Sequence, residues 1–500
     1  MPTTQPRSAR RAPPRGCDSR RQYRFRPRGV SQRTESGIRR AISSWRVAVP
    51  TFCLLEIECA DRRPRHARAR RRVSFSKEGT MASELLKGFR MLDLADEKGA
   101  MCGKIFADLG ADVIKVEPVG GCSTRRIPPF LEDIPGEDRS LYFLAYHAGK
   151  RSVTANLEST DGRALVAELA RHADFLVESF PLGYLDSIGL GYDELSRANQ
   201  RLIYASITPF GDKGPAKNYK AADIVTWASG GMMYLMGEEG RPPLQMSLPQ
   251  AGMHAGAEAA VASLIAHYPR QTSGLGQKIV VDMQACIVWT LMNEQAMPIF
   301  HGDFLRRSGV FVGSADARRK MVFRCADGHI SILIMGGAVG APSTIALVKW
   351  MDEKGFASDW MKTKDWMSWV PGLLMAMTQK DREEIDELED RVEKFFLTMT
   401  KHEIYREALK RRILLAPVAT VADIAADEQL EARKFFVKVD HHDTLGRSLT
   451  FPGPFARFTE TPIAPPARAP RLGEHNREVY CGLLGLDLER LSRLSAEGAI

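Results

Sequence analysis

From residue 86 onward the chain alternates between short apolar runs of strand length and segments of helix length. The runs that predict strands lie at 89–94, 113–116, 151–157, 174–180 and 201–210. Between them, the apolar spacing predicts helices over 102–109 and 161–173. Strands separated by helices indicate an α/β fold with a doubly wound parallel sheet. The turn after the first strand lacks the pattern GxGxxG, so nothing indicates NAD or FAD.

Residues 252–500 follow a less regular pattern. An Ala-rich segment at 252–268 predicts a long helix, which a turn at 273–277 joins to a strand at 278–283. A pair of strands is expected within 322–334, and residues 345–412 are typical of helices rich in Met and Trp. We interpret that Met and Trp content as core packing rather than as a cofactor site.

Residues 1–80 differ from the remainder in charge. They hold 21 Lys and Arg against 6 Asp and Glu in a chain of net charge +9, so the remainder is mildly acidic and gives no electrostatic argument for nucleic acid. Three interpretations of this basic leader are open: a nucleic-acid arm, a mitochondrial transit peptide, and a mis-called start. Codons for Lys77-Glu78-Gly79 can form a ribosome-binding site ahead of Met81, which favours a start there. A leader that is translated is expected to be disordered.

Two features narrow the class of protein further. No apolar run reaches the roughly 18 residues of a membrane-spanning helix, so no membrane partner is expected. The eight cysteines include no CxxC pair, which indicates neither a disulfide scaffold nor a cysteine zinc site. We therefore expect reduced cysteines, no metal and a cytoplasmic protein.

Seven short motifs run through the chain in a fixed order. They lie at 110–118 (GADVIKVEP), 149–152 (GKRS), 174–180 (DFLVESF), 202–207 (LIYASI), 273–277 (SGLGQ), 416–418 (APV) and 472–475 (LGEH). Their order and spacing over about residues 85–495 resemble the class III CoA-transferases, the CaiB/BaiF type. That family includes formyl-CoA:oxalate and crotonobetainyl-CoA:carnitine CoA-transferases.

The resemblance implies a domain organisation and a set of partners. Residues 81–285 would form a Rossmann-like large CoA-binding domain with a parallel sheet, residues 286–422 a smaller α+β domain, and residues 423–500 a segment that returns to the large domain. Two such chains would form an interlocked dimer. Coenzyme A or acyl-CoA would be a substrate, and a carboxylic acid would be the second one.

The resemblance also implies a reaction through an enzyme carboxylate. An Asp attacks the acyl-CoA thioester and forms a mixed anhydride, which the released CoA thiolate converts to an aspartyl-CoA thioester before the acceptor acid reverses the exchange. In the family this Asp lies shortly before the long helix, four residues ahead of a Gly. Taking Gly256 as that glycine places Gly252 at the nucleophile position. The chain is therefore expected to be a variant that lacks the catalytic Asp.

Other side chains could replace the missing carboxylate. Asp223 occupies an acidic position that lies near the active site in the family, and the alternative is a helix cap. His254 could act as a base, or it could be a packed or surface residue. Glu258, one turn further on, is most simply a solvated side chain.

The CoA contacts of the family carry over by position. They fall on Glu97, Lys98, Pro118, Ala155, Asn156, Ser179, Phe180 and Lys220. Pro118 stands where the family often has an Arg, so one phosphate contact is expected to be lost. Lys220 could supply a cation for a phosphate, and its alternative is an exposed surface charge.

Three functions agree with this sequence. The first is a subunit of a CoA-transferase whose paralogous partner carries the Asp, with CoA moving from an acyl-CoA thioester to a free carboxylic acid. The second is a non-catalytic CoA or acyl-CoA binding protein. The third is an active homodimer that uses Asp223 or another carboxylate.

Overall fold

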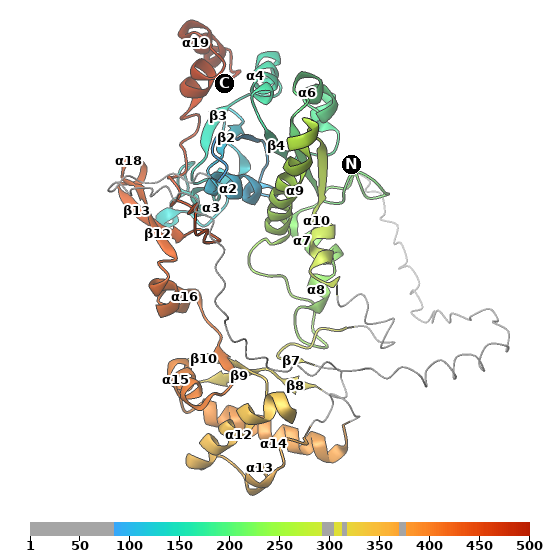
Figure 1. Ribbon diagram of the computed structural model, residues 1–500, viewed down its shortest axis with the longest axis vertical. Helices are drawn as coiled ribbons and strands as arrows, with labels where there is room; N and C mark the ends of the chain where they lie inside the picture. The colour runs from blue at the N-terminus through green and yellow to red at the C-terminus, as the bar shows by residue number, and fades with distance from the viewer. Residues whose placement is uncertain (1–84, 293–304, 313–317, 370–376) are drawn as a thin grey trace, which may run out of the picture. The chain divides into compact units, whose positions relative to one another are not determined.

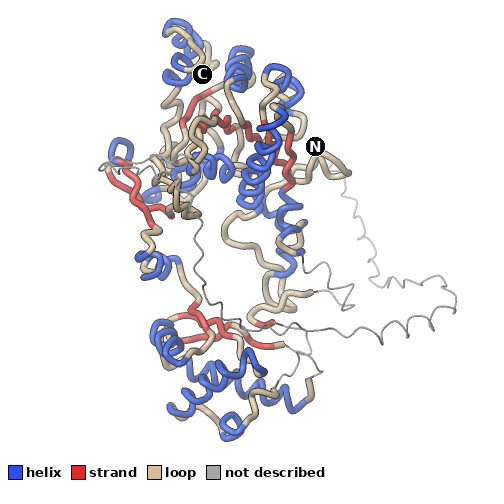
Figure 2. The backbone as a smooth tube through the Cα atoms, viewed as in Figure 1, coloured by secondary structure: helices blue, strands red, loops and turns tan. Residues whose placement is uncertain are grey.

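The computed structural model describes residues 85–292, 305–312, 318–369 and 377–500 (Figure 1). The basic leader predicted at 1–80 lies outside these residues. Within them, helices and strands alternate through the first part of the chain, as the sequence pattern predicts (Figure 2).

Six strands form one parallel sheet. They are β1 (Arg90–Asp93), β2 (Asp112–Glu117), β3 (Arg151–Thr154), β4 (Phe175–Glu178), β5 (Ile203–Thr208) and β6 (Lys278–Asp282). Their order in space is β3-β2-β1-β4-β5-β6, and every neighbouring pair is parallel. This is the Rossmann order, in which the strand order reverses between β1 and β4 and ligands bind beyond the carboxyl ends. The predicted Rossmann-like sheet is confirmed.

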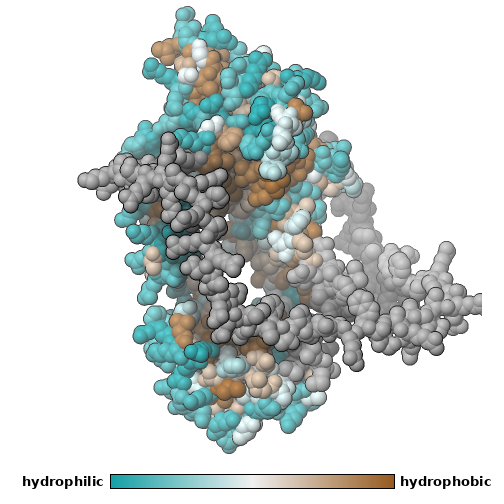
Figure 3. All heavy atoms as spheres, in the orientation of Figure 1, coloured by the Kyte–Doolittle hydropathy of each residue, from teal (hydrophilic) through white to brown (hydrophobic). Residues whose placement is uncertain are grey.

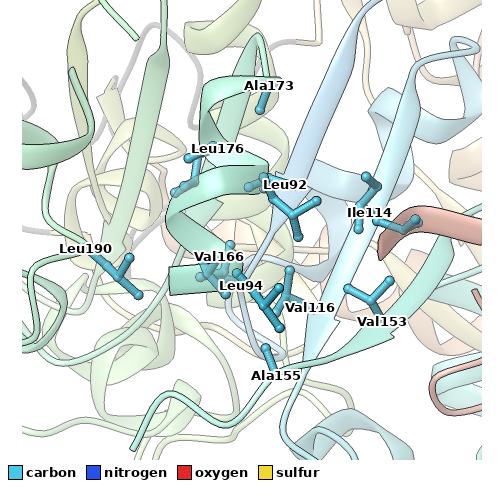
Figure 4. Packing of buried hydrophobic residues seen from close by; sticks show 14 of the residues in the cluster. Leu92, Leu94, Ile114, Val116, Val153, Ala155, Val166, Ala173, Leu176 and Leu190 are labelled. Carbon is cyan, nitrogen blue, oxygen red and sulfur yellow. The ribbon is translucent and has the colours of Figure 1, made fainter. Parts of the chain in front are cut away.

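Helices cover both faces of this sheet. The larger ones are α2 (Ala100–Asp108), α4 (Thr160–Arg171), α9 (Ala251–Ser273) and α10 (Met283–Trp289). Leu92, Ile114 and Val153 belong to a core shared with α4, where Val166 packs among them (Figure 4). The intervening strand residues, such as Met91, face a second core that is shared with α2, α9 and α10. Burial on both faces explains why the strands are continuous apolar runs rather than alternating ones.

Shorter helices connect these elements. They are η2 (Ser123–Arg126), η3 (Leu131–Asp133), α3 (Leu141–Tyr146), α5 (Tyr184–Ser187), α6 (Tyr192–Ala198), α7 (Asp223–Ser229) and α8 (Met232–Leu235). Ser140 and Ser159 cap the first turns of α3 and α4 through their hydroxyl groups, each accepting from a backbone N–H.

The long helix α9 extends beyond the predicted end at residue 268. It includes Pro269 and ends at Gly274, which has the left-handed φ of +74° that favours glycine at a helix end. Arg270 is fully buried in this last turn, and its guanidinium donates to the carbonyls of Asp174 and Arg201 at 2.8 and 2.9 Å. These distant contacts hold the turn in place, which local sequence does not reveal.

A second, antiparallel sheet forms further along the chain. Its strands are β9 (Val322–Cys325), β10 (Gly328–Ile332) and β11 (Leu415–Pro417) in the order β11-β10-β9, and a short pair, β7 (Phe311–Val312) and β8 (Arg319–Lys320), precedes it. The helices of this region are α12 (Gly337–Glu353), α13 (Asp359–Thr363), α14 (Gln379–Phe396) and α15 (Lys401–Arg411). Trp350, Trp366 and Met361 are buried in its core, so the interpretation of Met and Trp as packing residues is confirmed.

The remaining elements run to the end of the described chain. They are α16 (Val421–Ala425), α17 (Glu428–Ala432), β12 (Phe436–His441), α18 (His442–Leu445), β13 (Arg447–Pro452), η4 (Arg477–Cys481) and α19 (Leu488–Ala496). Val479 and Tyr480 of η4 are buried in the core beside α4. The mixed α/β fold class is confirmed. Helices α10 and α16 span the positions 285 and 422 where domain boundaries were predicted, and that division stays a prediction.

Candidate active site

A cavity of about 540 Å³ opens at the carboxyl ends of β1, β2 and β3, beside the point where the strand order reverses. Its walls come from β2 and from the segments that follow β1, β3 and β4. The polar or aromatic residues that line it are Asp96, Lys115, Glu117, Ser123, Asn156, Glu158, Phe180 and Tyr184. This is the edge of the sheet at which Rossmann-like folds hold nucleotides.

An aromatic wall closes one side of the cavity. The rings of Phe180 and Tyr184 stack with their centroids 5.1 Å apart. Pro118 and Ala155 provide apolar lining from the ends of β2 and β3. A flat heterocycle such as adenine can stack on such a wall, while the carboxylates and the amide can accept or donate hydrogen bonds at its edge.

A buried ion pair supports the floor of the cavity at the end of β2. The Arg125 guanidinium donates to both carboxylate oxygens of Glu117, at 2.7 and 2.8 Å, and both side chains are fully buried. Ser152 donates a third hydrogen bond to Glu117, at 2.6 Å. Burial alone would raise the pKa of Glu117, but the hydrogen bonds and charge of Arg125 hold it below its usual range. Glu117 therefore stays ionised.

The turn after β1 connects the cavity to helix α9. Asp96 lines the cavity, its N–H donates to the Ser179 hydroxyl at 2.8 Å, and that hydroxyl donates back to its carboxylate at 2.7 Å. Lys98 forms an ion pair with Asp96. The Tyr142 hydroxyl donates to the carbonyl of Glu97 at 3.3 Å. The turn is thus fixed by contacts from β4 and α3.

The first turn of α9 meets this turn closely. A Cβ atom added at Gly252 would lie 3.1 Å from both the Glu97 carbonyl oxygen and the Lys98 Cα. The backbone N–H of Gly252 donates to one oxygen of Asp223 at 3.0 Å, and that of Gln250 donates to the other at 3.1 Å. Asp223 therefore caps the start of α9 from α7, and both of its oxygens are engaged. The cap thus acts on α9, whereas Asp223 is itself the first residue of α7, whose N-cap is Ala222.

The start of α9 adds a second placement for the missing nucleophile. Gly252 lies inside the helix, whereas the resemblance places the Asp shortly before the helix and four residues ahead of a Gly. Taking Gly252 itself as that glycine gives Leu248, which is 67% exposed in the segment that approaches α9. Neither Gly252 nor Leu248 carries a carboxylate, so both placements lead to the same chemical conclusion.

The two other candidates on α9 differ in their surroundings. His254 is half-buried, and its imidazole has no hydrogen bond or ion pair with any residue that the structure describes. Glu258 is half-buried and lies near the thiol of Cys286. Burial and the Glu258 carboxylate raise the pKa of Cys286. Glu258 is therefore less solvated than the sequence indicates.

The structure brings most of the predicted CoA contacts together. Pro118, Ala155, Asn156 and Phe180 line the cavity, whereas Glu97, Lys98 and Ser179 lie in or against the turn after β1. Lys220 is exposed and pairs with no carboxylate among the residues that the structure describes. Whether these residues touch CoA stays a prediction.

Most of the lining residues have no counterpart among the sequence-based candidates, and Asp96, Tyr184 and Gly498 are three examples. Asp96 is adjacent to the predicted contacts Glu97 and Lys98. It could have been predicted as a polar residue in the turn that follows the carboxyl end of β1. Tyr184 lies four residues after Phe180, the spacing of one helical turn. Gly498 lies 342 residues after Asn156 in the sequence. The side-chain amide of Asn156 donates to the Gly498 carbonyl at 3.1 Å, and no local sequence signal predicts this contact.

The described residues lack the features of two other classes of protein. None of the helices placed by the structure is long and apolar enough to cross a membrane. Among the same residues, no group of three or more His, Cys, Asp or Glu side chains could hold a metal ion.

The sheet has the Rossmann order, and the cavity lies beside the point where that order reverses. Residues 86–476 match the family model described as CoA-transferase family III. The chain belongs to this family, and the expected enzyme class, a CoA-transferase, is confirmed.

Individual relatives agree with this assignment. The chain is 35% identical over 411 residues to the succinyl-CoA:(R)-benzylsuccinate CoA-transferase subunit BbsE of Thauera aromatica, covering 82% of this chain and 97% of that protein. It is 28% identical to the succinyl-CoA–L-malate CoA-transferase beta subunit of Chloroflexus aurantiacus, covering 85% and 100%. The crystal structure of a CaiB/BaiF family protein from Brucella suis superposes with a TM-score of 0.68 at 29% identity, covering 80% and 100%.

Proposed function

We propose that this chain is one subunit of a CoA-transferase made of two kinds of chain. It holds CoA at the carboxyl ends of β1 to β4, and a paralogous chain supplies the Asp nucleophile. The observation that carries this proposal is the contrast between a built cavity and a helix start without a carboxylate at Gly252 or Leu248. The names of two relatives, each called a subunit, support it.

The reaction divides between the two chains. The partner's carboxylate attacks the thioester carbonyl, the carbon–sulfur bond breaks, and CoA leaves as a thiolate. The thiolate attacks the resulting anhydride, releases the donor acid and forms an aspartyl-CoA thioester, from which the acceptor acid recovers CoA by the same two steps. This chain binds CoA and keeps it in place through both exchanges. Dicarboxylic or aromatic acids are the proposed substrates, in line with the relative that acts on benzylsuccinate.

The surface of α9 fits a protein that works with a partner chain. Val261, Ile265 and Tyr268 lie on one face of the helix and are 56%, 65% and 78% exposed. Hydrophobic side chains gather at the surface over this helix (Figure 3). In addition, helices α16 and α17 contain no buried residue, and isolated helices of this length are unstable in water. A second chain of the same fold, in a homodimer or a heteromer, would bury both regions.

Two alternatives remain in the proposal. An active homodimer could use Asp223, because its carboxylate lies against the first turn of α9, although both oxygens already accept backbone hydrogen bonds. A non-catalytic CoA-binding protein would need only the cavity. In all three cases we place the protein in the cytoplasm.

The test compares the chain alone with a two-chain complex. The full chain is purified alone and co-expressed with a same-fold paralogue that carries the Asp, and CoA transfer from succinyl-CoA to a set of carboxylic acids is measured by chromatography. We expect background transfer alone, no hydroxylamine-trapped acyl adduct on this chain, and activity in the complex. Robust transfer by the chain alone that Asp223→Ala abolishes would establish the homodimer instead. CoA binding without transfer in any complex would establish the non-catalytic protein.

A further inference from the structure

Three charged side chains meet in the interior at the end of β1, and the proposed reaction uses none of them. Asp93, Lys115 and Lys150 are 0%, 1% and 3% exposed. The Lys150 ammonium donates to one oxygen of Asp93 at 2.7 Å, and the Lys115 ammonium donates to the other at 3.3 Å. Burying three charges is unfavourable unless each is paired, so this cluster needs an explanation.

Every polar hydrogen of the two ammonium groups has an acceptor. Lys115 donates to the Asp93 carboxylate, to the Asp93 carbonyl and to the Ala95 carbonyl. Lys150 donates to Asp93, to the Ala100 carbonyl and to Nδ1 of His147. Burial and the neighbouring cations hold the pKa of His147 well below its usual value, so His147 is neutral and its Nε2–H points to Thr124.

The carbonyls bound by these lysines mark the two ends of one turn. At its start, the N–H of Ala95 donates to Asp93 at 3.0 Å, and the carbonyl of Ala95 accepts from Lys115. At its end, the carbonyl of Ala100 accepts from Lys150 at 3.2 Å. Helix α2 leaves room for the cluster because a Cβ at Gly103 would lie 2.3 Å from the Asp93 carboxylate. The cluster therefore clamps residues 95–100 at both ends.

The middle of this turn touches both halves of the candidate site. Asp96 lines the cavity and bonds Ser179. Glu97 and Lys98 lie within contact distance of the space beside Gly252 at the start of α9. A shift of the turn by a few tenths of an ångström would change the cavity wall and the helix start together.

We propose that Asp93, Lys115 and Lys150 are positioning residues that fix the turn at 95–100 and thereby couple the CoA cavity to the start of α9. The part of this inference that concerns CoA rests on the proposed function. The part that concerns the turn does not, since it follows from contacts within the described chain. A purely structural cluster would support the sheet as a whole, whereas a clamp acts on the turn and on α9.

Lys150→Met in the full chain tests the clamp, because methionine keeps most of the apolar side chain, one heavy atom shorter, and removes all three donors. Hydrogen exchange followed by mass spectrometry is measured without ligand on peptides covering 95–101, 249–254 and, as an internal reference, 203–208 of β5. We expect exchange to rise about tenfold or more in the first two peptides, the size of effect that the loss of a charged hydrogen bond produces, and to stay unchanged in β5. Calorimetry should show a weakening of CoA binding of about tenfold.

Lys104→Met is the matched control, since the Lys104 side chain pairs with Asp108 on the same helix and forms no hydrogen bond or ion pair with residues 95–100 of the described chain. The triple variant Asp93→Asn/Lys115→Met/Lys150→Met removes all three charges, so that no buried charge is left unpaired if Lys150→Met fails to fold. With a clamp, the triple variant recovers thermal stability but keeps fast exchange at 95–101 and weak CoA binding. Exchange equal to that of Lys104→Met, or full recovery of all three properties in the triple variant, would overturn the inference. If the wild type binds no CoA, the proposed function fails, while the exchange data still decide the clamp.

Discussion

The cavity at the strand ends and the first turn of α9 lie on either side of one turn of the chain, yet they are built differently. The cavity is supported by fully buried charges, among them the pair Arg125 and Glu117. The start of α9 has a glycine packed against backbone at 252, an exposed leucine at 248 and the capping carboxylate of Asp223. One side is thus a cavity supported by buried charges, whereas the other side has no carboxylate at 252 or 248, the two positions predicted for the nucleophile.

Under the proposed function, binding and covalent chemistry separate within one fold. A nucleophile would be a single side chain at a helix start, so a chain without it can keep the sheet, the cavity and the cap. The cavity depends on side chains from several segments of the chain. Its buried charges are paired, so removing one charge leaves its partner buried without a counter-charge. Substitutions on the two sides should therefore differ in size, and each prediction below measures that difference.

The largest effect is expected from Arg125→Met on the cavity side. It leaves the Glu117 carboxylate buried without its cation, which costs about 3–5 kcal/mol of the free energy of unfolding. Denaturant titration measures this loss, and CoA binding should weaken with it. The neighbouring Arg126→Met is the control, because Arg126 is exposed and donates only to backbone carbonyls. If Arg125→Met and Arg126→Met lost equal amounts of unfolding free energy, the buried ion pair would not support the cavity, and the contrast with the start of α9 would be removed.

The sequence predicts the cavity side better than the helix start, for physical reasons. The strand runs and the order of motifs place Pro118, Ala155 and Phe180 at strand ends, and parallel strands bring their carboxyl ends to one edge. Contacts across long separations are not predicted: Gly498 in the wall depends on the fold bringing it to Asn156. The helix start depends on which glycine anchors the comparison with the family, because moving the anchor by four residues, from 256 to 252, moves the nucleophile position from Gly252 to Leu248.

Glu178 at the end of β4 gives a pH-dependent test of the cavity side. Burial raises its pKa to about 7 from an ordinary 4.5, even though Ser206 and the N–H of Phe180 bond to it. A raised carboxyl pKa means that the wild type loses stability as pH rises from about 4.5 to 7 and changes little above that.

Glu178→Gln removes this dependence, because the amide stays neutral at every pH. We expect it to raise the free energy of unfolding at pH 8 by about 2–3 kcal/mol and to change it little near pH 4.5. Denaturant titrations at the two pH values measure both changes in the free energy of unfolding. Glu194→Gln is the control, because Glu194 is exposed. If the stability of Glu178→Gln followed pH in parallel with that of the wild type, Glu178 would be ionised in the folded protein without cost.

A carboxylate added on the α9 side should give opposite results at the two placements. Gly252→Asp forces atoms against the Glu97 carbonyl and Lys98, so it should cost about 1–3 kcal/mol of stability and produce no transfer activity. Leu248→Asp lies in an exposed segment and should change stability by less than about 0.5 kcal/mol. Thermal unfolding and the CoA-transfer assay of the chain alone measure both. Activity gained by Leu248→Asp would identify 248 as the nucleophile position, and activity gained by Gly252→Asp would identify 252.

Among the variants expected to lose stability, Asp223→Ala should lose the least, because it removes only the cap of α9. The backbone N–H groups of Gln250 and Gly252 lose their acceptor, and such a loss costs about 1 kcal/mol of stability. CoA affinity should stay unchanged, since Asp223 lines no part of the cavity. Asp223→Asn keeps one acceptor oxygen and should recover about half of the loss. If Asp223 were instead the nucleophile, both variants would abolish transfer at unchanged stability, so unfolding and activity measured together separate a cap from a catalytic carboxylate. A cap is what two engaged oxygens at a helix start predict.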